Sequence, residues 1–393
     1  MYETLEVLGP EHEFSIVDET LRPLSIVDDV IKELRGRIAN NVTLEGITFG
    51  QELQSHVAEF KANVPFTSPC IFEETMYESL LTISELLQRR FHADLLGLGM
   101  HPLLELDKVK IWSHWDRVYR ALGSIFNLRQ HGWLNIQSFQ LNIPYSSEEE
   151  GVRLLNTVSN LLPYLPAISA ASPIYEAKLG EFVDNRLFFY KVNQKEVPSI
   201  TGDIVPEYIT SFDEYREVTI DKYSRELKEL DADPHIIGKE WLNSRGAIFR
   251  FDRRAIEIRV MDEQDCIKSD VALSCFIRAA LRGLLDENVY LPHEMLVDDL
   301  NAVMKDGLNA MVRAGTSNAR DVCSHFYDIA VRNATEDEKK YLWLVKKRIA
   351  EGNLSDLVIR DIVKRSQKTS LIEAIHGVYA TLKQKLRKNE PYT

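Results

Sequence analysis

The amino-acid sequence predicts an α+β fold, with a sheet formed by the first two thirds of the chain and a helical C-terminal part. Three observations lead to this prediction. Strand-like and helix-like segments mix without a regular strand–helix–strand repeat, which favours antiparallel strands. Polar residues two apart recur on several strands, and from Ser269 onward the apolar residues have almost only helical spacing.

The first elements follow from apolar spacing and from punctuation by proline and glycine. Residues 8–18 are predicted to form a strand. A turn at Arg22-Pro23 precedes a second strand or the start of a helix, and residues 25–38 carry apolar residues at helical spacing. Residues 72–99 predict a long amphipathic helix that enters a strand, with Gly97 and Gly99 as punctuation.

The next elements extend the same mixture. Residues 113–129 predict a helix, and the alternating residues 133–145 predict a strand closed by Pro144. Residues 146–172 begin with a serine cap and glutamates in the first turn, and then continue as a helix until Pro163 or Pro166. Residues 190–240 are polar and contain several prolines, so we expect a loop-rich excursion that could cover a site. Residues 247–262 predict two strands around a turn at Asp252-Arg253.

Length and composition limit the class of protein. We expect the 393 residues to form a single catalytic domain, with a mixed sheet core over 1–268 and a mainly helical part over 269–393. A net charge of −13 argues against general nucleic-acid binding. The sequence has no long apolar run and no secretory signal, and its four cysteines are scattered, so we expect a cytoplasmic protein without a membrane partner.

Polar pairs on one face of three predicted strands provide the functional signal. Each pair lies two residues apart, and apolar residues point to the other face except at His12; the pairs are Glu11 with Glu13, Gln140 with Asn142, and Glu257 with Arg259. A sheet with one solvated face explains the alternation. It explains less well why these residues are Glu, Gln, Asn and Arg, and a concave face that holds metal ions and a charged substrate fits better.

Two further carboxylates extend this signal. Glu52 and Glu59 are seven residues apart, so on a straight strand they would point to opposite faces, and a bulge or a strand end is needed to bring them together. Four carboxylates from two segments could hold two or three divalent ions, and oxygen ligands suit Mg²⁺ or Mn²⁺. The alternative is an ion pair between the first strand and Arg259 or another arginine.

Other residues are weaker candidates. Arg250 belongs to a basic cluster whose forked donors suit phosphate, and Arg186 follows a Ser-Pro break in a loop. His101 ends a strand before a proline and is more often a packed or capping histidine than a catalyst. The sequence has neither a P-loop nor a Rossmann motif.

These segments together resemble the second glutamate–cysteine ligase family, the carboxylate–amine ligases of the glutamine synthetase superfamily. "GPEHEFSIVD" resembles the opening G-x-E-x-E strand of the family, and "QELQSHVAEF" its E-L-x-Q-x-x-V-E segment. Five more pieces follow in the family order: "GLGMHP", "RVYRAL", "LPAISAASPIYEAKLGEFVDNR", "IEIRVMD" and, more weakly, "LNAMVRAGTSNA".

The resemblance implies a fold and a reaction. The antiparallel sheet would curve into a funnel, with helices on its outer face and ATP and metal ions along its inner face. A carboxylate, such as that of glutamate, would take the γ-phosphoryl group of ATP to give an acyl phosphate, and an amine would then displace phosphate to form an amide. Both substrates would be small molecules.

The resemblance also assigns roles. Glu11, Glu13, Glu52, Glu59 and Glu257 would ligate Mg²⁺, with Mn²⁺ as the alternative. Arg259 and Arg186 would act on phosphate and substrate, and we expect Gln140, Asn142, Arg250, Arg313 and His101 to contact substrate or nucleotide.

The sequence also departs from the family pattern. Gln140 stands where many relatives have histidine, and glutamine cannot carry a proton charge. Two alternatives to the ligase stay open, namely a non-catalytic relative that binds a nucleotide or amino acid, and a phosphotransferase on the same fold. The sequence leaves the amine, the carboxylate and any homo-oligomer undecided.

Overall fold

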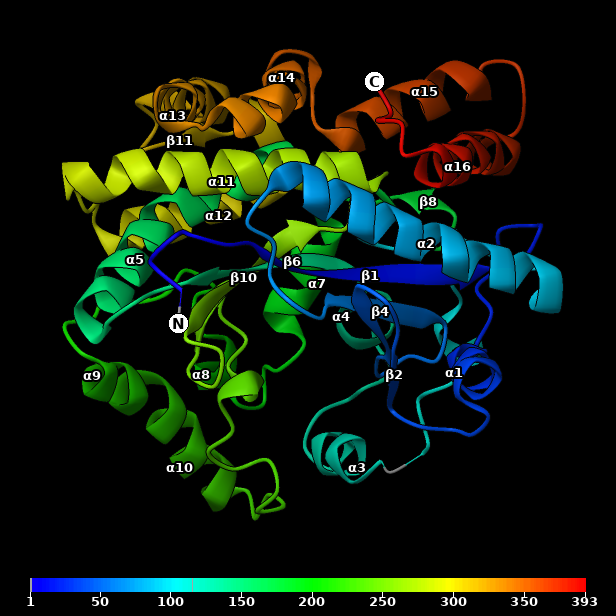
Figure 1. Cartoon of the computed structure of the whole chain (residues 1–393), viewed down its shortest axis with the longest axis horizontal. Coiled ribbons are helices and arrows are strands. Elements are labelled where there is room, and N and C mark those ends of the chain that lie inside the picture. The colour runs from blue at the N-terminus through cyan, green and yellow to red at the C-terminus, as the bar shows by residue number, and fades with distance from the viewer. Residues whose placement is uncertain (1, 115) are drawn as a thin grey trace.

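The computed structural model describes residues 2–114 and 116–393, in which an open antiparallel sheet is covered on one side by long helices (Figure 1). The eight described strands of this sheet have the order β2-β3-β4-β1-β6-β10-β9, with β5 paired to the far part of β1. Their bounds are β1 (Gly9–Val17), β2 (Asn41–Thr43), β3 (Ile47–Gln51), β4 (Val57–Ala62), β5 (Asp94–Leu96), β6 (Ser138–Pro144), β9 (Ala247–Arg250) and β10 (Ala255–Asp262). The predicted α+β class with a curved antiparallel sheet is confirmed.

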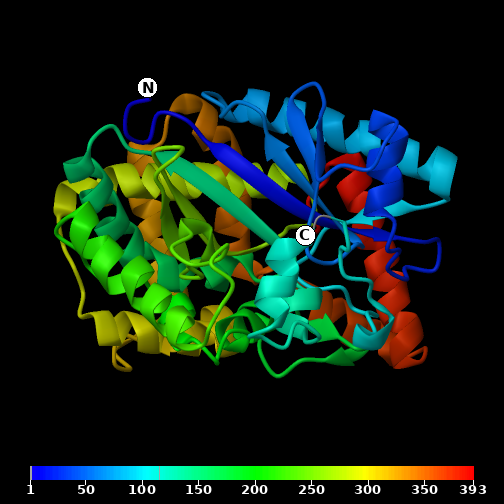
Figure 2. The ribbon, with the colours of Figure 1, turned by 90° about the horizontal axis from the view of Figure 1, so that it is seen from below.

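The central strands β1 and β6 lie side by side, as the view from below shows (Figure 2). Their side chains alternate between two faces. Phe14 and Ile16 of β1 and Phe139 and Leu141 of β6 join the main apolar core, whereas the polar pairs point away from it. The predicted alternation therefore describes the real sheet, with the core on the helix side.

The helices in the first half of the chain follow the predicted order, with differences in where they begin and end. The predicted cap of residues 146–172 is confirmed, because the Ser147 side chain accepts a hydrogen bond from the Glu150 backbone N–H. The predicted helix over 113–129 is shorter, since α3 begins at Arg117, and its residue Trp115 lies outside the described residues. The bounds are α1 (Val27–Arg35), α2 (Pro69–Phe91), α3 (Arg117–Gly123), α4 (His131–Leu134), α5 (Glu148–Leu161), α6 (Leu165–Ser169) and α7 (Asn185–Val192).

The expectation of a loop-rich region over 190–240 is wrong for its second half. A helical stretch runs from Phe212 to Glu229 as α9 (Phe212–Arg216), a π-helical turn (Glu217–Asp221) and α10 (Lys222–Glu229), and a short α8 (Pro198–Thr201) precedes it. The Ser211 side chain caps its start. Tyr215, Tyr223 and Leu227 recur at multiples of four residues and are buried, so an apolar stripe stabilises this helical stretch despite its polar composition.

The C-terminal third is almost wholly helical, as predicted. One buried apolar cluster contains residues of the sheet and of α11 to α14, while α15 and α16 pack in a second cluster. The division of the chain at residue 268 stays a prediction. No helix among the described residues is long and apolar enough to cross a membrane. The helix bounds are α11 (Ile267–Glu287), α12 (His293–Asp306), α13 (Ala319–Asn333), α14 (Glu336–Glu351), α15 (Leu354–Ser366) and α16 (Leu371–Lys388). Two further small sheets have two strands each. The first pairs β7 (Ile174–Tyr175) with β8 (Lys178–Leu179), and the second pairs β11 (Met311–Val312) with β12 (Ser317–Asn318).

Candidate active site

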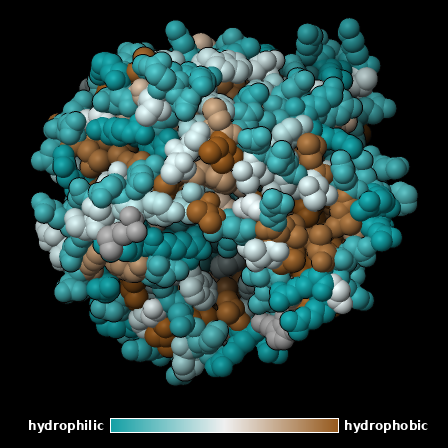
Figure 3. All heavy atoms as spheres, in the orientation of Figure 1, coloured by the Kyte–Doolittle hydropathy of each residue, from teal (hydrophilic) through white to brown (hydrophobic). Residues whose placement is uncertain are grey.

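A cavity of about 600 Å³ opens on the face of the sheet away from the long helices. Figure 3 shows a hollow on this side of the molecule. The cavity brings together nine residues proposed from the sequence: Glu11, Glu13, Glu52, Glu59, Gln140, Arg186, Arg250, Glu257 and Arg259. They come from segments up to 248 residues apart.

Three carboxylates form one wall of the cavity, which we call the carboxylate wall: Glu13, Glu52 and Glu59. Glu13 lies directly opposite Glu59 in the β1–β4 pairing. β3 ends at Gln51 and β4 begins at Val57, so the chain reverses direction between Glu52 and Glu59. This strand end removes the difficulty that their spacing of seven residues posed, because the two glutamates belong to opposite arms of a hairpin.

The carboxylate wall is electrostatically crowded. Burial raises the pKa of Glu52 well above its ordinary value, and the neighbouring Glu59 and Glu13 raise it further. Burial likewise raises the pKa of Glu59 to about 7, although Lys61 opposes the shift with its ammonium group 2.7 Å away. Burial also raises the pKa of Glu13, despite its hydrogen bonds from Ser138. These carboxylates lack enough cationic partners in the protein.

The other two glutamates proposed from the sequence, Glu11 and Glu257, already form ion pairs with basic side chains. Arg253 pairs with Glu11, and Lys61 lies 3.4 Å from the second oxygen of Glu11. Burial alone would raise the pKa of Glu11, but Lys61 and Arg253 outweigh it and hold this pKa at about 2. Glu257 lies 2.5 Å from Arg250 Nη1 and 3.3 Å from Arg259 Nε. The ion-pair interpretation thus describes Glu11 and Glu257 in this structure.

Two of the predicted arginines are held by the backbone around the cavity. A β-bulge between Ile258 and Met261 interrupts the β6–β10 pairing at Arg259, and Arg259 Nη1 donates to the Asn243 carbonyl at 2.8 Å. Arg186 is buried, donates from Nε to Asp262 at 2.5 Å and from Nη2 to the Val260 carbonyl at 2.7 Å. Both guanidinium groups are therefore fixed in position before any ligand arrives.

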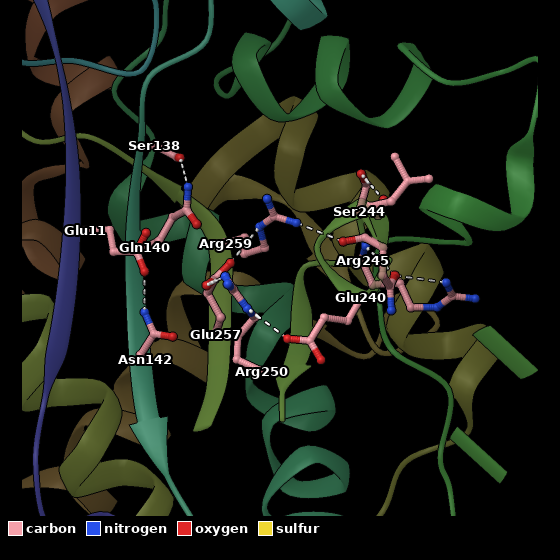
Figure 4. Close-up of polar contacts among 12 residues, drawn as sticks. Glu11, Ser138, Gln140, Asn142, Glu240, Ser244, Arg245, Arg250, Glu257 and Arg259 are labelled. Carbon is pink, nitrogen blue, oxygen red and sulfur yellow. Dashed lines mark hydrogen bonds and ion pairs between the residues drawn. The ribbon is translucent and has the colours of Figure 1, made fainter. Parts of the chain in front are cut away.

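The amides of β6 contact the glutamates of β1. Gln140 Nε2 donates to Glu13 Oε1 at 3.0 Å, and Asn142 Nδ2 donates to Glu11 Oε1 at 2.9 Å. Figure 4 shows Gln140 and Asn142 on β6 beside Glu11, with Glu257, Arg250 and Arg259 on the next strands. Gln140 thus acts as a hydrogen-bond donor, whereas Asn142 does not line the cavity itself.

The structure does not bring His101 or Arg313 to the cavity. His101 is buried beside His56, with ring centroids 6.5 Å apart, and burial lowers its pKa to about 3. The backbone N–H of Arg313 donates to Asp299, and the guanidinium of Arg313 lies over Tyr164 on the helical side. Their proposed contact with substrate stays a prediction without support from this arrangement.

Sequence reasoning missed several residues that line the cavity. Lys61 was detectable, because it follows Glu59 by two residues and so shares its strand face. Aromatic residues from loops and short helices form a further wall, and their irregular spacing gave no periodic signal; they are Trp112, Tyr119, Trp133, Tyr190 and Trp241. This wall offers flat apolar surface next to the charged groups.

The donor set fits a hard divalent cation. Glu13, Glu52 and Glu59 offer oxygen ligands only, and burial raises the pKa of each of these carboxyl groups despite the nearby cations. A cation at these oxygens would relieve the repulsion.

Comparisons with known proteins agree with this arrangement. The model of glutamate-cysteine ligase family 2 matches residues 7–377. An uncharacterized protein of Archaeoglobus fulgidus is 46% identical over 387 residues, which cover 98% of this chain and all of that protein. The fold resembles glutamate–cysteine ligase from Francisella tularensis in complex with AMP, with a TM-score of 0.64, 12% identity, and coverage of 98% of this chain and 90% of that chain. It also resembles a bifunctional glutathione synthetase from Pasteurella multocida, with a TM-score of 0.62 and 14% sequence identity. That match covers 96% of this chain and 52% of the longer chain of the synthetase.

Proposed function

Because the chain belongs to glutamate-cysteine ligase family 2, we propose that it is an ATP-dependent carboxylate–amine ligase that forms an amide bond through an acyl phosphate. One observation carries the proposal. The cavity holds an undercompensated wall of carboxylates, Glu13, Glu52 and Glu59, and arginines that are fixed in place, Arg186 and Arg259. A reaction between a nucleoside triphosphate and a carboxylate needs both kinds of group.

In the first step, a carboxylate oxygen of the substrate attacks the γ-phosphorus of ATP, and the bond to the ADP oxygen breaks. The guanidinium groups of Arg259 and Arg250 donate to phosphate oxygens, whose negative charge spreads during transfer. Glu13, Glu52 and Glu59 would hold Mg²⁺, which would supply further positive charge at the phosphates. Arg186 orients the substrate carboxylate, because its own position is fixed by Asp262.

In the second step, the amine nitrogen attacks the acyl carbon, the carbon–oxygen bond to phosphate breaks, and the nitrogen loses a proton to solvent. Acyl phosphates are reactive, so this step needs little acid–base catalysis. The buried floor of the cavity limits access of water to the acyl phosphate, which protects it from hydrolysis.

The first experiment measures phosphate release from ATP with Mg²⁺ over a panel of amino acids, alone and in pairs with amines, and identifies products by mass spectrometry. We expect release that depends on a carboxylate such as glutamate, rises with one amine and yields an amide. A phosphorylated product without an amide would indicate the phosphotransferase. Nucleotide binding by calorimetry without turnover for any pair would indicate the non-catalytic relative.

Variants of the carboxylate wall link the activity to the site. Glu13→Gln and Glu52→Gln should each lower turnover at least a hundredfold while the far-UV circular dichroism spectrum stays unchanged. Glu45→Gln is the matched control, since Glu45 is exposed in the turn between β2 and β3 and does not line the cavity. Normal turnover in Glu52→Gln would contradict the assignment of this wall.

A further inference from the structure

A second cluster of ligand-type side chains lies on the opposite face of β1. His12 stands between Glu11 and Glu13, so its side chain points away from the cavity and into the core. Its Nδ1 lies 3.2 Å from Glu263 Oε1 and 3.6 Å from Asp270 Oδ2. One potential ligand atom from each residue lies within 4.8 Å of the other two. We call His12, Glu263 and Asp270 the back-face triad.

The back-face triad is fully buried, and among the described residues no arginine or lysine pairs with its two carboxyl groups. None of its members has measurable solvent exposure. In the described part of the chain, the carboxyl group of Asp270 lies within hydrogen-bonding reach of the Glu263 carboxyl group, and the ion pairs of Glu263 and Asp270 involve His12 alone. Two buried carboxylates without a cation are costly, because the core cannot solvate them.

Two other buried aspartates in the same segment each have an arginine as ion-pair partner. Asp262 pairs with Arg186, and Asp265 pairs with Arg348 at 3.1 Å. The fold thus supplies an arginine to each of these carboxylates, whereas the triad carboxylates receive only an imidazole. An imidazole and two carboxylates within ligand distance form a set that binds divalent transition metals.

We propose that the back-face triad binds one divalent transition-metal ion of the Zn²⁺ type. Two carboxylates, a neutral imidazole and a divalent cation sum to zero charge, which is the state that a buried site favours. The ring of His12 is held for this role by Phe139, 4.9 Å away between centroids, and by stacking on Phe14.

The proposed ion would connect the sheet to the helical part. His12 belongs to β1, Asp270 to the first turns of α11, and Glu263 to the segment between β10 and α11. The second oxygen of Glu263 also accepts a hydrogen bond from the Glu13 backbone N–H at 3.2 Å. An ion here would therefore fix the strand that carries Glu11 and Glu13, without itself taking part in the reaction.

The test is the metal content of tag-free protein after dialysis against EDTA, measured by inductively coupled plasma mass spectrometry. We expect about one transition-metal ion per chain, retained because no solvent reaches the site. Glu52→Gln should retain the ion, which separates the triad from the cavity. Asp270→Asn and His12→Gln should each lose it, whereas Asp265→Asn, a buried acid outside the triad, should keep it.

Two results would overturn the proposal. Wild-type protein that is folded and free of transition metal would show that protons alone neutralise the triad. Metal retained in both Asp270→Asn and His12→Gln would place the ion elsewhere. If the triad variants do not fold, wild-type protein is unfolded in the presence of EDTA and refolded with Co²⁺. Visible absorption bands of a protein-bound Co²⁺ ion would support the site. Folded protein without such bands would refute it.

Discussion

Replacing Glu59 by glutamine tests the electrostatics of the cavity in the absence of any substrate. Glu59 is buried opposite Glu13, and burial raises its pKa from the ordinary value of 4.5 to about 7. A carboxyl group with a raised pKa binds its proton more tightly in the folded protein than in the unfolded chain. Folding is therefore favoured below the unfolded pKa, and this contribution is lost as the pH rises from 4.5 to about 7.

The size of the effect follows from the same shift. Each pKa unit corresponds to about 1.4 kcal/mol, so ionised Glu59 costs about 3 kcal/mol of stability above neutral pH. Glu59→Gln removes this cost but deprives Lys61 of one partner, while Glu11 remains within 3.4 Å of Lys61. We therefore expect the unfolding free energy of the variant at about pH 8 to be about 2 kcal/mol higher than that of the EDTA-treated wild type. Near pH 4.5 or below, the two unfolding free energies should be equal.

Urea denaturation of both proteins between about pH 4.5 and pH 8 measures this difference. Added Mg²⁺ should then stabilise the wild type at the higher pH by about 3 kcal/mol at a hundredfold excess over Kd, and the variant by much less. A difference between the two proteins that does not change with pH would refute the charge argument. Equal stabilisation of both by Mg²⁺ would refute the role of Glu59 as a ligand.

Three further substitutions address other parts of the molecule. Arg259→Lys should lower kcat/KM for ATP at least tenfold with unchanged thermal stability, because lysine lacks the planar fork; unchanged steady-state kinetics would contradict its phosphate role. Arg186→Gln should lower the unfolding free energy in urea by about 3 kcal/mol, since it leaves buried Asp262 unpaired, and a smaller loss than about 1 kcal/mol would contradict this. Leu227→Ala should cost about 2–4 kcal/mol in the same assay, whereas exposed Lys228→Ala should cost almost nothing; equal costs would show that the α10 stripe is not a packed surface.

The sequence could predict the strand-borne part of the site because strands place every second residue on one face. Glu11, Glu13, Gln140, Glu257 and Arg259 all lie on the cavity face for this reason. The helical stretch Phe212–Glu229 was missed although it carries a Ser cap and apolar residues four apart, because prolines on either side and a polar composition dominated the interpretation. The aromatic wall could not be predicted, since tertiary packing of irregular segments brings it to the cavity.

The charges of the cavity also imply an order of cation binding. Glu11 is occupied by Arg253 and Lys61, whereas Glu13, Glu52 and Glu59 lack sufficient cations. A first ion should therefore bind at the carboxylate wall, and an ion at Glu11 can bind only after Arg253 has left it. An arriving phosphate group would draw Arg253 away, because guanidinium groups pair well with phosphate.

Arg253→Gln reproduces that release without nucleotide. We expect titration with Mn²⁺, followed by electron paramagnetic resonance of the free ion, to show one more bound ion per chain in Arg253→Gln than in the wild type. Arg254→Gln is the matched control, because Arg254 is the neighbouring arginine and its guanidinium donates to the Ser146 carbonyl. Equal numbers of ions in the wild type and Arg253→Gln would mean that Glu11 serves as a permanent ion-pair partner, and that the cations of the reaction depend on the carboxylate wall alone.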